Sequence, residues 1–213
     1  MYTALAMDRE MHARGRKSTF RATGQTGILI TGSGVPLDAV VADFMAGAVE
    51  WLTPANDDDH WDMLEGQGSL MNPAYPGGFE ILAAGRPDLV VLQHAPARKD
   101  YDGFPGYPIQ PLSRQIEAVE ILSGKPVVAV TVNHENLAAD RIPAVCEAIH
   151  TVAGLPAFDV LRDQADTKAA ATTEPGAART RGERVVQRLR DVAQRTQSGL
   201  LVELAARIPA EFK

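Results

Sequence analysis

The stretch Ala22-Thr-Gly-Gln-Thr-Gly-Ile-Leu-Ile-Thr-Gly-Ser-Gly34 decides the fold prediction for this chain. It follows a strand-like run at residues 18–21 and precedes residues 36–51, which have helical periodicity. Glycine lets the backbone approach a ligand closely, and successive N–H groups can point at one anion. The stretch therefore has two interpretations, an anion-binding loop or a plain strand–helix connection, and the sequence leaves both open.

A second glycine-rich stretch, Glu65-Gly-Gln-Gly-Ser69, ends an apolar strand predicted at residues 61–65. A carboxylate at the end of a strand, followed by a glycine turn, suits a magnesium–phosphate group, because the acid reaches the ion while backbone N–H groups face the anion. Glu65 is thus a candidate catalytic residue and a candidate Mg²⁺ ligand. The alternative is structural: Glu65 caps a helix or pairs with a lysine.

The candidates for cofactor binding all lie in these two stretches, where hydroxyl, amide and backbone N–H groups are concentrated. They are Thr23, Gly24, Gln25, Thr26, Gly27, Gly66, Gln67, Gly68 and Ser69. For the threonines and glutamine the alternative is that they satisfy backbone groups within their own turns.

Strands and helices alternate along the chain, which predicts an α/β fold with a parallel sheet covered on both faces. Strands are expected at residues 17–22, 61–65, 88–94, 126–133 and 157–160, and helices at residues 1–14, 37–51, 112–122 and 137–153. The expected apolar side of the second helix comprises Val40, Val41, Phe44, Ala48 and Trp51. In such sheets ligands bind beyond the carboxyl ends of the strands, where both glycine-rich stretches fall.

Other candidate site residues follow the strand predicted at residues 88–94. His94 is placed to act as a general acid or base, and Arg98 to hold a carboxylate bidentately, although a histidine there can also be structural. Tyr75 and Tyr107 are further candidates for substrate binding. Tyr107 belongs to a Gly/Pro-rich aromatic segment, residues 101–108, which is read either as a substrate-covering loop or as a rigid one. His12, His134 and His150 are read as surface or helix residues.

Composition narrows the function classes. The 213 residues carry a net charge of −6, which disfavours nucleic acid as the main partner, and no apolar run is long enough to span a membrane. The single cysteine, Cys146, excludes an internal disulfide and favours a cytoplasmic setting. We expect a small-molecule substrate and a homo-oligomer.

The domain prediction has three parts: an α/β domain at residues 1–162, a linker at 163–181 and an amphipathic helix at 182–213. The first helix begins without an N-cap, which suggests that the chain starts inside a domain.

Several motifs together resemble the P-loop domain of the DgcN-type D-glutamate N-acetyltransferase family. They are Ala-Thr-Gly-Gln-Thr-Gly at 22–27, Gly-Ser-Gly-Val-Pro-Leu-Asp-Ala-Val-Val-Ala-Asp-Phe at 32–44, Glu-Gly-Gln-Gly-Ser-Leu at 65–70, Pro-Ala-Tyr at 73–75 and Gly-Tyr-Pro-Ile at 106–109. The resemblance implies a three-layer P-loop NTPase-like sandwich, similar in outline to dethiobiotin synthetase. It also implies transfer of an acetyl group from acetyl-CoA to the amine of D-glutamate, with the glycine-rich loops holding the nucleotide part of CoA, or ATP in relatives that use it.

The chain departs from the family pattern at three places. The family carries a Walker-type Gly-Lys loop before the helix that begins at Met1, so the first strand and the phosphate loop are expected to be missing. Asn72 stands where family members often carry histidine, and residues 93–98 differ from the usual sequence. Three hypotheses follow: an acetyltransferase with His94 as base, a Mg-ATP-dependent ligase or kinase, or an inactive fragment or binding domain.

Overall fold

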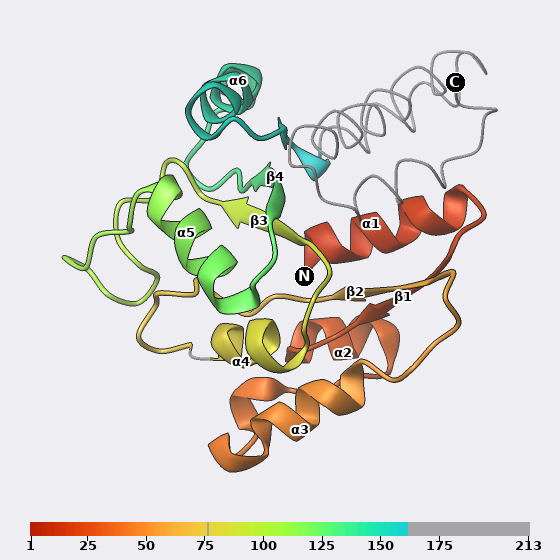
Figure 1. Cartoon of the computed structure of the whole chain (residues 1–213). Coiled ribbons are helices and arrows are strands. Elements are labelled where there is room, and N and C mark those ends of the chain that lie inside the picture. Colours follow the sequence, from red (N-terminus) through yellow and green to blue (C-terminus); the bar gives the residue numbers. More distant parts are fainter. Residues whose placement is uncertain (76, 162–213) are drawn as a thin grey trace. The chain divides into compact units, whose positions relative to one another are not determined.

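The computed structural model describes residues 1–75 and 77–161 (Figure 1). These residues divide into two compact units, each of which is described by itself. The first unit comprises Met1–Pro87 and Arg98–Pro126. The second comprises Asp88–Ala97 and, among the described residues, 127–161. The predicted linker and the predicted helix at 182–213 lie outside the described residues.

The first unit is built around two parallel strands, β1 (Lys17–Arg21) and β2 (His60–Leu64), in register from Lys17↔His60 to Arg21↔Leu64. The helix α1 (Tyr2–Ala13) packs against them. Its Leu5 joins Phe20 of β1 and Ala22 in a buried cluster, because alternate residues of a strand face the same side. This packing fixes the carboxyl ends of β1 and β2, from which the glycine-rich stretches continue.

Four further helices complete this unit: α2 (Gln25–Thr31), α3 (Ala42–Leu52), α4 (Gly77–Ala84) and α5 (Leu112–Ser123), with a short 3₁₀ turn at Leu37–Ala39. Leu37, Met45, Val49 and Ile81 form a second buried cluster, in which α3 meets α4. Burying several large aliphatic side chains contributes about 1.5–3 kcal/mol for each one.

Two helix predictions need correction. The stretch at residues 22–34, expected to be a loop, contains α2, because Gln25 to Thr31 form a helix that ends at Gly32 in the left-handed conformation. The helix expected at 37–51 is broken at Val40 and Val41, where the backbone is extended.

The expected apolar side of that helix is also only partly right. Val40 and Ala48 pack against the core, but Val41, Phe44 and Trp51 are exposed. The buried face carries Met45, Val49 and Leu52 instead, because the break shifts the start of the helical repeat.

The second unit is a three-stranded parallel sheet in the order β3-β4-β5, comprising Val90–His94, Val127–Val132 and Ala157–Phe158. The helix α6 (Ile142–Ala153), preceded by a 3₁₀ turn at Ala139–Arg141, packs against β4 and β5. Every residue of the central strand β4 is buried, as its run of valines predicts for a strand covered on both faces.

Every strand pair in the described residues is parallel, which confirms the predicted α/β class with a mostly parallel sheet. The strands form two sheets, and α4 was not predicted, because a segment that begins Gly77-Gly78 has the composition of a loop. No helix within residues 1–75 and 77–161 is long and apolar enough to cross a membrane.

Candidate functional site

Glu65 follows β2 directly and is the centre of the first candidate site. Its side chain is buried, with 5% of the residue exposed. Oε2 accepts hydrogen bonds from the backbone N–H groups of Thr23 (2.9 Å) and Gly24 (3.2 Å). The carboxylate therefore holds the chain where it leaves β1, and it occupies two N–H groups that the sequence assigned to an anion.

The side chain of Thr23 is equally engaged. Its Oγ1 donates to the carbonyl of Glu65 (3.0 Å) and accepts from Nε2 of Gln67 (2.7 Å), while its carbonyl accepts from the N–H of Leu37. Thr23 is fully buried. These contacts link the two glycine-rich stretches to each other, as their pairing in the sequence suggested.

Gly27 lies in the first turns of α2, against the carboxylate. A Cβ at this position would lie 2.7 Å from Oε2 of Glu65 and 2.9 Å from Cβ of Ala22, which is closer than van der Waals contact allows. The glycine thus makes room for the acid, and its role in this structure is steric.

Among the cofactor-binding candidates, Gln25, Thr26, Gly66 and Gly68 are exposed at the surface, whereas Thr23 and Gly27 are buried. The exposed residues are the ones whose polar groups a ligand can reach without rearrangement. No observation places a ligand on them, so the whole set stays a prediction.

The magnesium prediction rests on the remaining oxygen of Glu65. Oε1 lies 3.6 Å from the amino group of Met1, at the N-terminal end of α1, where the helix dipole favours negative charge. Among the described residues no group of three or more His, Cys, Asp or Glu side chains is placed to hold a metal ion. A Mg²⁺ site of one carboxylate and substrate phosphates would not need such a group, so this assignment also stays a prediction.

Asn72 connects the second glycine-rich stretch to the aromatic segment. It is buried, its Oδ1 accepts from the N–H of Ala74 (2.9 Å), and its Nδ2 donates to the carbonyl of Asp102 (3.1 Å). Gly68 has a positive φ of 41°, and a Cβ there would lie 2.9 Å from the side chain of Tyr75. The chain around Tyr75 is thereby fixed from both sides.

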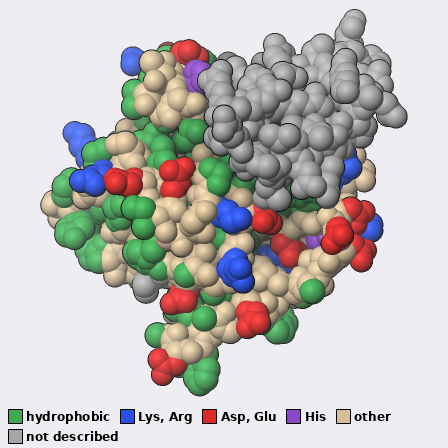
Figure 2. Space-filling view, viewed as in Figure 1, with side chains coloured by type: hydrophobic (Ala, Val, Ile, Leu, Met, Phe, Trp, Pro, Cys, Tyr) green, Lys and Arg blue, Asp and Glu red, His purple; other side chains and the backbone are tan. Residues whose placement is uncertain are grey.

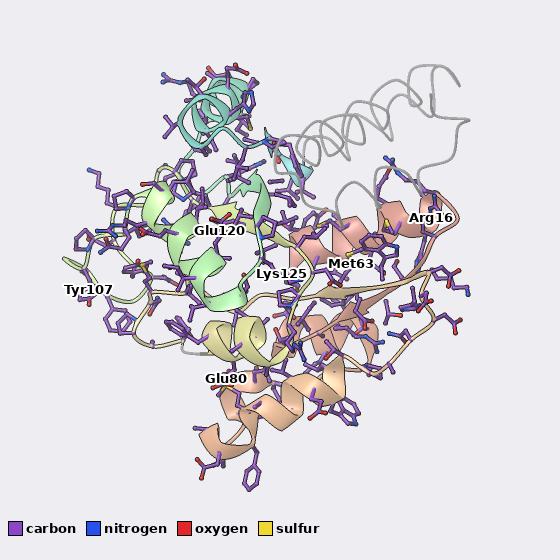
Figure 3. The ribbon with its side chains drawn as sticks, viewed as in Figure 1. Arg16, Met63, Glu80, Tyr107, Glu120 and Lys125 are labelled. Atoms are coloured by element: carbon purple, nitrogen blue, oxygen red, sulfur yellow. The ribbon has the colours of Figure 1, made fainter. Side chains whose placement is uncertain are left out.

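The aromatic segment forms a tied loop in this structure. Tyr101 is buried, its N–H donates to the carbonyl of Tyr107 (2.9 Å), and the two rings lie 5.9 Å apart. The N–H of Gly106 donates to the carboxylate of Asp100 (2.9 Å). These contacts fit the rigid-loop alternative. Tyr107 itself is 53% exposed and lies at the outer end of the loop (Figure 3), and Arg98, at the base of the loop, is half-buried.

The carboxyl edge of the second unit's sheet carries two histidines. His94 ends β3, and its carbonyl accepts from the N–H of Asn133 (2.8 Å), just beyond β4. His134 follows, and its Nε2 lies 2.5 Å from Oδ1 of Asp159, beyond β5. Both of the residues in this last pair belong to segments that the sequence analysis left without a function.

Asp159 is buried, with 4% of the residue exposed. Its Oδ1 also accepts from the N–H of Leu161 (2.9 Å), but Oδ2 accepts no hydrogen bond from any described residue. His134 was read as a surface or helix residue; it lies outside any helix, and its side chain is partly exposed, at 29%. Ligand sites in α/β proteins lie beyond the carboxyl ends of parallel strands. The expected last strand ran to residue 160, whereas β5 ends at Phe158, so Asp159 was placed inside the strand and not beyond its end.

The surface mixes charges of both signs. The face drawn in Figure 2 carries Lys and Arg side chains among Asp and Glu, without one sign prevailing. On the first unit, hydrogen bonds from Lys17 to Asp59 and Asp57 raise the pKa of Lys17, and the Lys17 hydrogen bond lowers the pKa of Asp59. All three side chains are well exposed, so this cluster is a surface feature.

Comparison with known proteins decides the family. Residues 1–168 match the family described as "Domain of unknown function (DUF1611_C) P-loop domain". The chain belongs to the DUF1611 family. The fold is accordingly the P-loop-like α/β sandwich that the motifs suggested, and the resemblance to the DgcN-type family is confirmed.

Relatives of this DUF1611 member include two proteins named D-glutamate N-acetyltransferase. One, from Tritonibacter scottomollicae, is 50% identical over 168 residues, covering 76% of this chain and 50% of the relative. The other, from a Pseudoalteromonas species, is 38% identical over 174 residues, covering 78% and 52%. The chain thus spans about half the length of the curated relatives it matches.

A solved structure agrees with the fold. The crystal structure of a DUF1611 family protein from Anabaena variabilis superposes with a TM-score of 0.71 at 33% sequence identity, covering 75% of this chain and 49% of that one. The described residues therefore share the architecture of a DUF1611 protein over most of their length.

Proposed function

We propose that this chain takes part in the transfer of an acetyl group from acetyl-CoA to the amine of D-glutamate or a related amino acid. The observation that carries the proposal is the match to two proteins named D-glutamate N-acetyltransferase, at 50% and 38% identity. Because the match covers half of each relative, the activity of the whole relative is brought to this chain as a proposal.

The reaction requires three kinds of functional group from the protein. A base must accept a proton from the attacking amine, donors must stabilise the oxyanion that forms on the thioester carbonyl, and a cation must hold the substrate's carboxylate. In this proposal His94 is the base named from the sequence, Arg98 holds the carboxylate, and Tyr75 and Tyr107 are further substrate contacts. N–H groups of residues 66–69 serve the oxyanion or the phosphates of CoA.

Two backbone N–H groups of the first glycine-rich stretch already have an acceptor within the protein. Thr23 and Gly24 give their N–H groups to Glu65, so the proposal assigns the CoA phosphates to the exposed residues Gln25, Thr26, Gly66 and Gly68. Acetyl-CoA is a cosubstrate here. The single cysteine fits the cytoplasmic setting that the proposal assumes, and a homo-oligomeric state stays a prediction.

A second candidate function is a Mg-ATP-dependent ligase or kinase of the dethiobiotin-synthetase-like class. It is favoured by the family's P-loop description and by the buried carboxylate of Glu65 at the end of β2. In that reading Glu65 lies near the magnesium ion, and the reaction releases ADP. A third outcome, a domain that binds neither ligand, would leave the chain without catalysis of its own.

Product analysis separates these functions. The 213-residue chain is incubated with acetyl-CoA and D-glutamate, and in parallel with Mg-ATP and D-glutamate, and the products are identified by mass spectrometry. N-acetylglutamate with an equal amount of CoA supports the proposal, with L-glutamate as the stereochemical control. Release of ADP without acetylated product favours the ligase or kinase, and absence of both products from a folded sample contradicts catalysis by this chain.

A further inference from the structure

The pair formed by His134 and Asp159 is the strongest unassigned feature of the described residues. Both residues lie beyond the carboxyl ends of neighbouring strands, β4 and β5, within one unit. Nε2 of the histidine lies 2.5 Å from Oδ1 of the acid. This is the edge of a parallel sheet at which α/β proteins bind their ligands.

Asp159 is held in place but is not fully satisfied. The N–H of Leu161 fixes Oδ1, and the residue is 4% exposed, while Oδ2 has no hydrogen-bond partner among the described residues. A carboxylate buried with an unpaired oxygen carries a free-energy cost, and such groups in folded proteins call for an explanation in function. A role beside a residue that becomes positively charged during a reaction supplies one.

The contact also determines which nitrogen of His134 can act. Nε2 is not aligned for a hydrogen bond with the acid in this structure, but a carboxylate oxygen 2.5 Å away favours the tautomer with its proton on Nε2, which leaves Nδ1 as the proton acceptor. None of the hydrogen bonds among the described residues uses Nδ1 of His134, and 29% of the side chain is exposed. A ligand can therefore reach the imidazole while the acid holds it from behind.

We propose that His134 is the residue that accepts the proton of the attacking amine, and that Asp159 is the positioning residue that orients its imidazole. This inference rests on the proposed function and transfers the role of base from His94 to His134. It follows the general logic of an acid–histidine pair, in which the acid fixes the tautomer and faces the imidazolium that forms.

The neutral amine of the amino acid attacks the thioester carbonyl, forming the N–C bond, and the C–S bond then breaks. The nitrogen gives one proton to Nδ1 of His134, and that proton passes to the departing thiolate. The products are the N-acetylated amino acid and the CoA thiol, and no metal or redox partner is consumed.

A second Asp–His pair of this chain supplies the matched control. His12 and Asp8 lie on α1, with Nε2 of His12 3.9 Å from Oδ1 of Asp8, but His12 is 56% exposed and its Nε2 contacts the carbonyl of Ser18 at 2.9 Å. Asp8 accepts from the hydroxyl of Ser18 instead (2.7 Å). This pair links α1 to β1 and lies beyond no strand end, so removing it should not affect proton transfer.

The first arm of the test is spectroscopic and does not depend on turnover. Long-range ¹H–¹⁵N correlations of the imidazole are recorded on the full ¹⁵N-labelled chain. We expect the Nε2–H tautomer for His134 in the unmodified protein and a mixture of tautomers after Asp159→Asn. A predominant Nδ1–H tautomer, or a spectrum that Asp159→Asn leaves unchanged, overturns the pair whatever the activity.

The second arm measures acetyl transfer. We expect His134→Ala to lower kcat by about 10²- to 10⁴-fold, the usual contribution of general base catalysis, with a much smaller change in KM for the amino acid. Added imidazole should restore part of the lost rate, and His12→Ala should retain full activity. His134→Gln, which keeps a polar side chain against Asp159, serves as the second variant in case alanine disturbs folding.

The two failures are distinguishable. If the unmodified chain acetylates and both His134 variants retain its kcat, the role of base is overturned while the acetyltransferase function stands. If His94→Ala alone abolishes turnover, the role returns to His94. If the unmodified chain forms no acetylated product, the proposed function fails and the role of His134 as base fails with it. The orientation of the imidazole by Asp159 is then judged separately, from the tautomer of His134.

Discussion

The two buried acids of this chain, Glu65 and Asp159, occupy equivalent positions in their own sheets but differ in what surrounds them. Each directly follows a parallel strand, and each is about 5% exposed or less. Oε2 of Glu65 accepts from two backbone N–H groups, whereas Oδ2 of Asp159 accepts from no described residue. A satisfied acid holds the fold together, and an unsatisfied one is the better candidate for function.

The contrast also bears on the two interpretations of the glycine-rich stretch at residues 22–34. Glycines, threonines and a strand end are the ingredients of an anion site, but here a protein carboxylate takes the place of the anion at Thr23 and Gly24. The stretch is shaped by an acid that comes 42 residues after Thr23 in the sequence. A glycine- and threonine-rich stretch after a strand can therefore bind either an external anion or a carboxylate of the protein itself.

Removing the satisfied acid should have the largest effect on stability. Glu65→Ala leaves two backbone N–H groups without their acceptor, and we expect a loss of about 2–4 kcal/mol in the free energy of unfolding. Urea denaturation measures it, with Glu50→Ala, an exposed acid on α3, as the control expected to stay within about 0.5 kcal/mol of the unmodified chain. Equal free energies of unfolding for the two variants would show that the hydrogen bonds to Glu65 contribute little to the stability of the fold.

Gly27→Ala tests the steric side of the same arrangement. Its new Cβ would lie 2.7 Å from Oε2 of Glu65, so we expect a loss of about 1–3 kcal/mol, the usual cost of overpacking. Gly47→Ala on α3 is the matched control, because nothing lies within 4 Å of its Cβ position, and it should stabilise the helix by about 0.5–1 kcal/mol. Thermal denaturation of the two variants should therefore move in opposite directions.

Asp159→Ala should cost less stability than Glu65→Ala, even though the two acids are equally buried. It removes one backbone acceptor contact, to Leu161, so we expect about 1 kcal/mol in urea denaturation. A loss as large as that of Glu65→Ala would mean that Asp159 is a structural acid too, and the contrast between the two edges would disappear.

The smallest effect is expected at the exposed cluster of Lys17, Asp57 and Asp59. The lowered pKa of Asp59 stabilises the fold above the unfolded pKa of the acid and is lost as pH falls through its folded value. The raised pKa of Lys17 acts in the opposite sense, stabilising below its unfolded value and fading as pH rises through the folded one. Because these side chains are exposed, Lys17→Met should leave the Tm near that of the unmodified chain at neutral pH, and a large drop would show that the cluster is not merely superficial.

The sequence predicted the strands more closely than the helices, for a physical reason. The run from Val127 to Val132 has one reading, a strand buried on both faces, because β-branched residues without polar alternation suit nothing else of that length. The start of α3 depends instead on a break at Val40 and Val41, where the backbone is extended, and the apolar periodicity does not reveal this break. Val41, Phe44 and Trp51 were consequently assigned to the wrong face.

In the candidate site too, the sequence predicted some contacts and missed others. The pairing of the two glycine-rich stretches was visible from their positions after strands, and Thr23 does contact both Glu65 and Gln67. The partnership of His134 with Asp159 was not, because 25 residues and a helix separate the two residues in the chain. Only the strand order brings them together.

Amide hydrogen exchange at Thr23 and Gly24 tests the central contrast most directly. We expect both amides to be protected from exchange in the ligand-free chain, Glu65→Gln to weaken this protection, and acetyl-CoA or Mg-ATP to leave it unchanged. Rapid exchange of both amides in the free chain, with protection appearing only when one of these ligands is added, would show that the stretch is an anion-binding loop and would contradict the account.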